Sequence, residues 1–226
     1  MSQLALPLKL DDHAVFESFY PTGNEALLGA LDDLRQGGRG PGCFLWGASA
    51  TGKTHLLQAT CAATGDTSVY LPLSDLGPAD TGILEGLESR QFICLDDIDT
   101  VSGDDGWEHA LFALLNQATD AGSVIIVSSK AAPRESGFKL PDLVSRLARL
   151  AVYHLAVLGD DDRSRALQMR ARHRGLDLPD DTANFLLTRS KRYMASLYAL
   201  LDQLDDESLA AKRRLTIPFV KDVLGN

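Results

Sequence analysis

This sequence has few cysteines, no long apolar run and no excess of basic residues. Its three cysteines, Cys43, Cys61 and Cys94, show no CxxC spacing and lie in apolar segments. In such segments a thiol is usually a small buried hydrophobic group. We therefore expect neither a disulfide framework nor a cysteine metal site.

A membrane-spanning helix needs about 20 consecutive apolar residues, and the sequence contains no such run. The first residues do not read as a secretory signal either, because Gln3, Pro7 and Lys9 interrupt the apolar stretch and Asp11 and Asp12 end it. We therefore expect a cytoplasmic protein with no membrane partner.

Basic residues are fewer than acidic ones, and the chain has a formal net charge of −9 at pH 7. Residues 1–158 carry 10 Lys and Arg against 20 Asp and Glu, whereas residues 159–226 carry 12 against 11. The acidic part lacks the broad basic surface that non-specific DNA binding requires, so we expect any link to DNA to pass through another protein. The change in charge balance also indicates two units.

Short apolar or β-branched runs predict strands in the first part of the chain, at residues 43–47, 68–73, 92–97 and 123–129. Helical patterns lie between them, as at residues 54–64 and 107–119. After residue 159 the strand signals stop, and helices are predicted at residues 160–175, 179–190, 192–207 and 217–224.

This order predicts an α/β fold, with a parallel sheet sandwiched by helices and followed by a small all-α lid domain. We expect an extended tail at residues 1–12, a nucleotide-binding α/β domain at residues 13–158 and a helical lid at residues 159–226.

A glycine-rich segment follows the first predicted strand directly. It matches G-x-x-x-x-G-K-[ST] without a gap and consists of Gly47, Ala48, Ser49, Ala50, Thr51, Gly52, Lys53 and Thr54. Small residues are needed because backbone N–H groups must wrap around phosphate oxygens, while Lys53 reaches the outer phosphates and the Thr54 hydroxyl faces Mg²⁺. The sequence therefore predicts a site for ADP or ATP with Mg²⁺ rather than an ordinary glycine-rich turn.

An acidic pair ends the third predicted strand, FICLDD. Beside a phosphate-binding loop, Asp96 is the candidate for holding Mg²⁺ through water, and Asp97 for polarising the attacking water. Taken alone, such a pair is more often a helix cap or a turn. The preceding loop is what favours the functional interpretation.

A sheet domain followed by a compact helical lid is the AAA+ arrangement, which carries three further polar positions. The strand VIIV should end in a polar sensor, which leaves Ser128 or Ser129, and we take Ser129 as the nucleotide contact. The helix LPDLVSRLARL should direct Arg146 at a neighbour's nucleotide, and KRYMASL should return Arg192 to the chain's own nucleotide. The alternative for either arginine is a solvated position on a helix face.

These residues together resemble the Hda family of regulatory inactivators, which are homologous to the bacterial replication initiator DnaA. The resemblance extends over nearly the whole chain and rests on CLDDID, LPDLVSRL, the ending LTIPFVKDVL and above all the leading QLALPL. It implies a peptide that binds the sliding clamp, the beta subunit of DNA polymerase, through Gln3, Leu4, Leu6, Pro7 and Leu8.

In that peptide Leu6 and Leu8 can fill an apolar pocket of the clamp, Gln3 can hydrogen-bond at its edge and Pro7 keeps the chain extended. The other interpretation of the tail is an N-terminal arm that packs on its own domain.

The resemblance implies a negative regulator of chromosomal replication initiation. Bound to nucleotide and to the DNA-loaded clamp, it would dock on ATP-bound DnaA and insert Arg146 to promote hydrolysis there, with weak or no ATP turnover of its own. DNA would be reached only through the clamp, because the sequence ends after the lid, where an initiator continues into a DNA-binding domain. Homo-oligomer formation stays open. So do two other functions, a self-sufficient AAA+ ATPase such as a clamp-loader-like motor and a scaffold with a vestigial loop.

Overall fold

The computed structural model describes residues 14–225, apart from residue 39 and residues 77–80, 190–193 and 212–213. The chain divides into two compact units. The described part of the first comprises residues 14–16 and 23–156, and that of the second comprises residues 17–22 and 157–225. The Tyr20 hydroxyl, which donates a hydrogen bond to Asp162 Oδ1 at 2.8 Å, joins the short early segment to the second unit.

In the described part of the first unit, five parallel strands form one sheet. They are β1 (Gly42–Trp46), β2 (Ser68–Pro72), β3 (Phe92–Asp96), β4 (Val124–Ser129) and β5 (Ala151–His154). Their spatial order is β2-β3-β4-β1-β5. Strands β1, β3 and β4 are apolar and almost wholly buried, as expected for parallel strands that lie between two helix layers. The predicted α/β fold class is confirmed.

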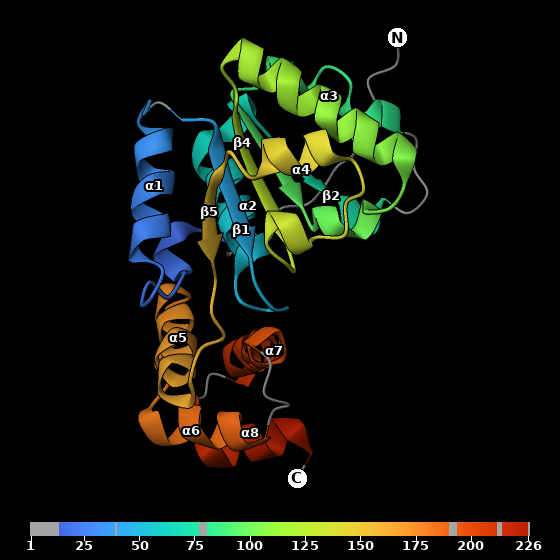
Figure 1. The fold of residues 1–226 in the computed structure, drawn as a ribbon. Coiled ribbons are helices and arrows are strands. Elements are labelled where there is room, and N and C mark those ends of the chain that lie inside the picture. The colour runs from blue at the N-terminus through green and yellow to red at the C-terminus, as the bar shows by residue number, and fades with distance from the viewer. Residues whose placement is uncertain (1–13, 39, 77–80, 190–193, 212–213, 226) are drawn as a thin grey trace. The chain divides into compact units, whose positions relative to one another are not determined.

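Helices cover both faces of this sheet. They are α1 (Glu25–Arg35), α2 (Lys53–Thr64), α3 (Asp105–Ala121) and α4 (Pro141–Leu147). Helices α3 and α4 pack on the face that presents Phe44 and Val127, and their leucines join these residues in one buried cluster (Figure 1). Helix α2 contacts β3 and β4. The loops that follow the carboxyl ends of β1, β3 and β4 therefore meet at one edge, where α/β sheets bind ligands.

The second unit is helical and has its own leucine-rich core. Its helices are α5 (Asp160–His173), α6 (Asp180–Arg189), α7 (Met194–Ala211) and α8 (Ile217–Leu224). Leu167, Leu186 and Leu201 are fully buried in this core. Arg174 Nη1 lies 2.6 Å from Asp202 Oδ1, and this ion pair ties the end of α5 to α7.

Two features of the first unit were not expected from sequence. Strand β5 is a short edge strand whose residues are largely exposed, so it lacks the buried apolar run by which the other strands were recognised. Between β2 and β3 the described residues form short 3₁₀ turns, at Leu73–Asp75, Thr81–Leu84 and Leu87–Ser89. No helix in the described residues is both long and apolar enough to cross a membrane.

Candidate nucleotide-binding site

The glycine-rich loop connects β1 to α2 and has backbone geometry that requires glycine at two positions. Gly47 has a φ of 153°, and a Cβ added there would lie 2.4 Å from the Leu155 carbonyl oxygen. Gly52 adopts a left-handed conformation with a φ of 98° immediately before α2. A side chain at Gly47 would clash with the Leu155 carbonyl, and one at Gly52 would strain the backbone, so the glycines give the loop the compact path that a phosphate-binding loop needs.

Lys53, the first residue of α2, lies over this loop and is 5% exposed. Its Nζ donates hydrogen bonds to the carbonyl oxygens of Gly47 at 2.8 Å and Ala48 at 2.9 Å. Burial lowers the pKa of Lys53, while the carboxylates of Asp97 and Asp96 act to raise it. The ammonium group is thus held between the loop and the acidic pair, where an anionic ligand would be stabilised.

Asp96 lies at the carboxyl end of β3, is 3% exposed, and has a hydrogen-bond donor on each carboxylate oxygen. The Ser128 hydroxyl donates to Oδ1, and the Tyr70 hydroxyl donates to Oδ2 at 2.8 Å. Burial and the charge of Asp96 raise the pKa of Tyr70, which therefore stays a donor at neutral pH. These two hydroxyls fix the orientation of the carboxylate.

Asp97 follows directly and has a left-handed backbone with a φ of 52°. Its backbone N–H donates to Ser128 Oγ at 2.9 Å, so one hydroxyl holds both members of the acidic pair. Burial raises the pKa of the half-buried Asp97 carboxyl, and the charges of Asp96 and Asp99 raise it further, against the opposing effect of Lys53. A raised pKa suits a group that accepts a proton from water.

Both sensor candidates at the end of β4 are buried near this cluster, but their hydroxyls differ in their contacts. Ser128 Oγ bridges Asp96 and the Asp97 amide. Ser129 Oγ accepts from the Ala131 amide at 3.3 Å, and the Ser129 carbonyl accepts from the Gly47 amide at 3.3 Å. Ser129 as a nucleotide contact stays a prediction, and the geometry gives Ser128 the closer link to the acidic pair.

The donor set fits a nucleoside phosphate. It offers a glycine loop, a buried cation at the start of a helix, an exposed hydroxyl at Thr54 and the buried carboxylate of Asp96. A hydroxyl and a carboxylate are ligands that Mg²⁺ accepts together with phosphate oxygens and water. The described residues contain no group of three or more His, Cys, Asp or Glu side chains that could hold a metal by themselves.

Arg146 lies near the amino-terminal ends of the strands, opposite the carboxyl ends where the phosphate-binding loop is found. The parallel register pairs Cys43 of β1 with Ala151 of β5, so the segment before β5 is level with the start of β1. Arg146, near the end of α4, accordingly lines a pocket with Pro41, which precedes β1. The phosphate-binding loop follows the opposite end of β1, roughly 16 Å away at the usual rise of a parallel strand. The structure does not bring Arg146 and Lys53 together.

Six predicted site residues lie outside the described residues. They are Arg192 and the tail residues Gln3, Leu4, Leu6, Pro7 and Leu8. Their roles stay predictions.

Glu108, which sequence reasoning did not single out, holds the segment that leads into α4. It is 1% exposed, and its Oε1 accepts from the Gly103 amide at 2.8 Å. Its Oε2 accepts from the amides of Lys139 at 2.9 Å and Leu140 at 2.6 Å. Leu140 is the residue immediately before α4. A glutamate among the apolar residues of a predicted helix was the available signal, but its partners Lys139 and Leu140 lie about 30 residues away and are found only from the fold.

Glu108→Gln is expected to lower the free energy of unfolding by about 2 kcal/mol or more. The neutral amide replaces an acceptor by a donor that faces backbone N–H groups, and hydrogen bonds to charged groups contribute about 1.5–3 kcal/mol each. Urea denaturation at pH 7 measures the loss, with Glu85→Gln at an exposed position as the matched control. An equal midpoint for both variants would show that the carboxylate does not hold this segment.

The pH dependence of that loss has a defined sign. Burial acts to raise the pKa of Glu108, but the amides of Lys139, Leu140 and Gly103 outweigh it and the pKa is lowered. A lowered pKa in the folded state stabilises the fold above the pKa of the unfolded chain, and this contribution is lost as the pH falls. The difference between wild type and Glu108→Gln should therefore shrink as the pH falls from 7 toward 4.

Comparison with known proteins agrees with this geometry. Residues 160–224 match the family model described as "Hda, lid domain". The chain is similar to domain III of the Thermotoga maritima replication initiation protein DnaA, with a TM-score of 0.77 and 21% identity over 96% of this chain and 97% of that one. It is also similar to AMPPCP-bound DnaA from Aquifex aeolicus, with a TM-score of 0.70 and 23% identity over 90% of this chain and 69% of that one.

A third similar structure is the Thermotoga maritima RuvB Holliday junction branch migration motor, with a TM-score of 0.66 and 16% identity over 90% of this chain and 69% of that one. The two DnaA structures named above have higher TM-scores than this RuvB structure, and the lid segment is matched separately. The chain therefore has the AAA+ fold of DnaA domain III, and its residues 160–224 match the Hda lid domain.

Proposed function

We propose that this chain is a nucleotide-bound AAA+ regulator of replication initiation that promotes hydrolysis of ATP held by the initiator DnaA. The observation that carries the proposal is the position of Arg146 at the sheet edge opposite the phosphate-binding loop of its own chain. An arginine there can reach the nucleotide of a neighbouring subunit but not its own. The match of residues 160–224 to the Hda lid domain and the likeness to DnaA domain III support DnaA as that neighbour.

The chain's own nucleotide would be held at the loop formed by residues 47–52. Lys53 would neutralise the outer phosphates, and Thr54 and Asp96 would hold Mg²⁺, which screens phosphate charge when bound. Ser128 and Tyr70 keep the Asp96 carboxylate in place through the hydrogen bonds described above. In this proposal the nucleotide orders the surface that docks on the initiator.

The tail at Gln3–Leu8 would tether the protein to the sliding clamp. This segment alternates Leu4, Leu6 and Leu8 with other residues, a pattern that suits an extended peptide with side chains in pockets on one side. A tether of this kind would restrict regulation to clamps already loaded on DNA, so that the initiator is switched off after replication has begun.

A self-sufficient AAA+ ATPase is the second candidate, and the raised pKa of Asp97 beside Lys53 favours it. The two functions differ in turnover by the purified chain alone. A regulator should form at most about one ADP per molecule in the absence of the initiator, whereas a motor should complete many cycles. Steady release of phosphate by the chain alone, abolished by Lys53→Ala, would replace the regulatory proposal by the motor.

Lys53→Ala is expected to weaken nucleotide binding by about tenfold or more, since charge-assisted contacts to phosphate contribute roughly 1.5–3 kcal/mol. Titration with a fluorescent ADP analogue measures the affinity, and the rise in melting temperature with ADP should disappear in the variant. Lys221→Ala, at an exposed lysine of α8, is the matched control. An unchanged ADP-induced rise in the Lys53 variant would place the nucleotide elsewhere.

A further inference from the structure

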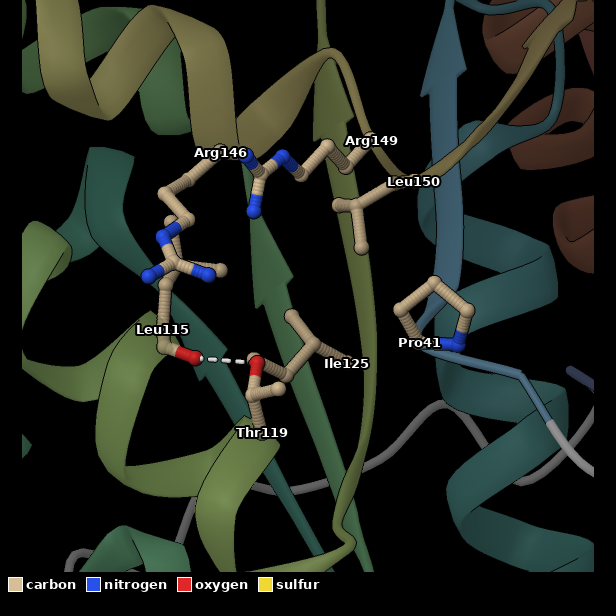
Figure 2. A pocket seen from close by; sticks show the side chains of 7 residues that line it. All are labelled: Pro41, Leu115, Thr119, Ile125, Arg146, Arg149 and Leu150. Atoms are coloured by element: carbon tan, nitrogen blue, oxygen red, sulfur yellow. Dashed lines mark hydrogen bonds between the residues drawn. The ribbon is translucent and has the colours of Figure 1, made fainter.

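A small apolar pocket lies beside Arg146, near the amino-terminal ends of the strands and away from the nucleotide site. Its volume is about 160 Å³. Figure 2 shows its walls, which come from α3, the start of β4, the segment before β1 and the segment after α4. Its apolar lining consists of Pro41, Leu115, Ile125 and Leu150. All of these elements belong to the first unit.

A second arginine, Arg149, lines the same pocket, and its guanidinium group points toward the side chain of Arg146 (Figure 2). Arg149 is exposed and Arg146 is half-buried. Among the described residues, the structure records no hydrogen bond or ion pair of either guanidinium group with a carboxylate. In a chain of net charge −9, two arginines that have no acidic partner among the described residues form a local site for an anionic group at one pocket.

The size of the pocket restricts what can occupy it. Sites for cofactors and drug-sized ligands have volumes of about 300–1,000 Å³, so this pocket is too small for a nucleotide. It has room for a single aliphatic side chain, and an apolar anchor in a pocket with charged groups at the rim is the usual form of a protein–protein contact. The chemistry points to a protein segment in which an aliphatic residue is followed or preceded by Asp or Glu.

We infer that this pocket is the docking site for one aliphatic side chain of the nucleotide-bound partner, and that an adjacent carboxylate of that partner pairs with Arg149. The identity of the partner as DnaA rests on the proposed function. This docking arrangement divides the work between the two arginines. Arg149 and the pocket hold the partner, and Arg146 acts on the partner's nucleotide, so substitutions at the two positions should change different quantities.

The test measures binding of the whole chain, in the presence of DNA-loaded clamp, to initiator loaded with AMPPCP, in which hydrolysis does not occur. Arg149→Glu reverses the charge at an exposed residue, and Thr119→Trp places a bulky ring in the pocket from an exposed position of α3. Each variant is expected to bind at least about tenfold more weakly than wild type, as loss of a central anchor or a paired charge does. Arg172→Glu, the same charge reversal at an exposed residue of α5, should bind within about twofold.

Unchanged binding by Arg149→Glu would overturn the inference, and melting temperatures establish that each variant is folded. Absence of binding by the wild type would overturn it together with the proposed function. Binding that depends on Arg149, together with no stimulated hydrolysis when the initiator carries ATP instead of AMPPCP, would refute the proposed function and leave the docking site standing. Self-association of the wild type that Arg149→Glu abolishes, seen by sedimentation without initiator, would assign the pocket to a second copy of this chain and overturn the inferred occupant.

Discussion

Arg146→Ala is expected to reduce stimulated hydrolysis of DnaA-bound ATP to near its unstimulated rate. An arginine finger stabilises charge that develops on the transferred phosphoryl group, and in other phosphoryl-transfer systems it contributes about 10³–10⁵ in rate. Arg146 is half-buried near the end of α4 and lies apart from its own phosphate-binding loop. Its removal should therefore leave this chain's folding, nucleotide affinity and clamp binding nearly unchanged, and the effect should be seen in the partner.

Arg146→Lys serves as the second variant. Lysine supplies a point charge without the planar fork that donates two parallel hydrogen bonds, so rescue should be poor. The alternative is a helix-surface arginine that contributes about 0–1 kcal/mol to stability and leaves the partner's hydrolysis almost untouched. Retention of more than about a third of the stimulation by Arg146→Ala would contradict the finger assignment, since the smallest expected effect is far larger.

The combined substitution of Leu6 and Leu8 by Ala is expected to remove clamp binding. Loss of two leucines that fill an apolar pocket should reduce the binding free energy by about 2–5 kcal/mol, by analogy with truncation of buried apolar side chains. A pull-down on the purified clamp measures the effect, and the melting temperature and ADP affinity should match those of the wild type.

The control for this variant truncates two apolar side chains outside the tail. Val152 is 43% exposed and Val157 is 59% exposed, so their replacement by Ala removes similar surface without touching residues 3–8. The control should bind the clamp as the wild type does. Undiminished binding by the Leu6 and Leu8 variant would mean that the tail is an arm of its own domain.

The spacing of residues within single segments was enough to predict the phosphate-binding loop, helix α8 and the acidic pair. The motif at residues 47–54 could be recognised from the fixed spacing of its glycines and lysine, and it forms the loop after β1 and the first residues of α2. Helix α8 has the bounds of the predicted helix at residues 217–224. The acidic pair at Asp96 and Asp97 lies at the end of a fully buried strand. In each case one segment of a few residues carries the whole signal.

Contacts between distant segments could not be predicted in this way. Tyr70 reaches Asp96 because β2 lies beside β3, and Glu108 binds Leu140 because α3 lies beside the segment before α4. Arg149 became a candidate for contact with the partner because it lines the same pocket as Leu115 and Ile125. Strand β5 was missed because its edge position leaves it short and exposed. These features depend on tertiary packing, which a single sequence read segment by segment does not contain.

The most direct test of the account is the amount of ADP formed on initiator-bound ATP in four mixtures. The mixtures contain the initiator alone, with this chain, with DNA-loaded clamp, or with both. We expect rapid conversion to ADP only when this chain and the loaded clamp are both present, and loss of this conversion with Arg146→Ala. Equal rates in all four mixtures would contradict the proposed function, and conversion by the chain without clamp would contradict the role given to Gln3–Leu8.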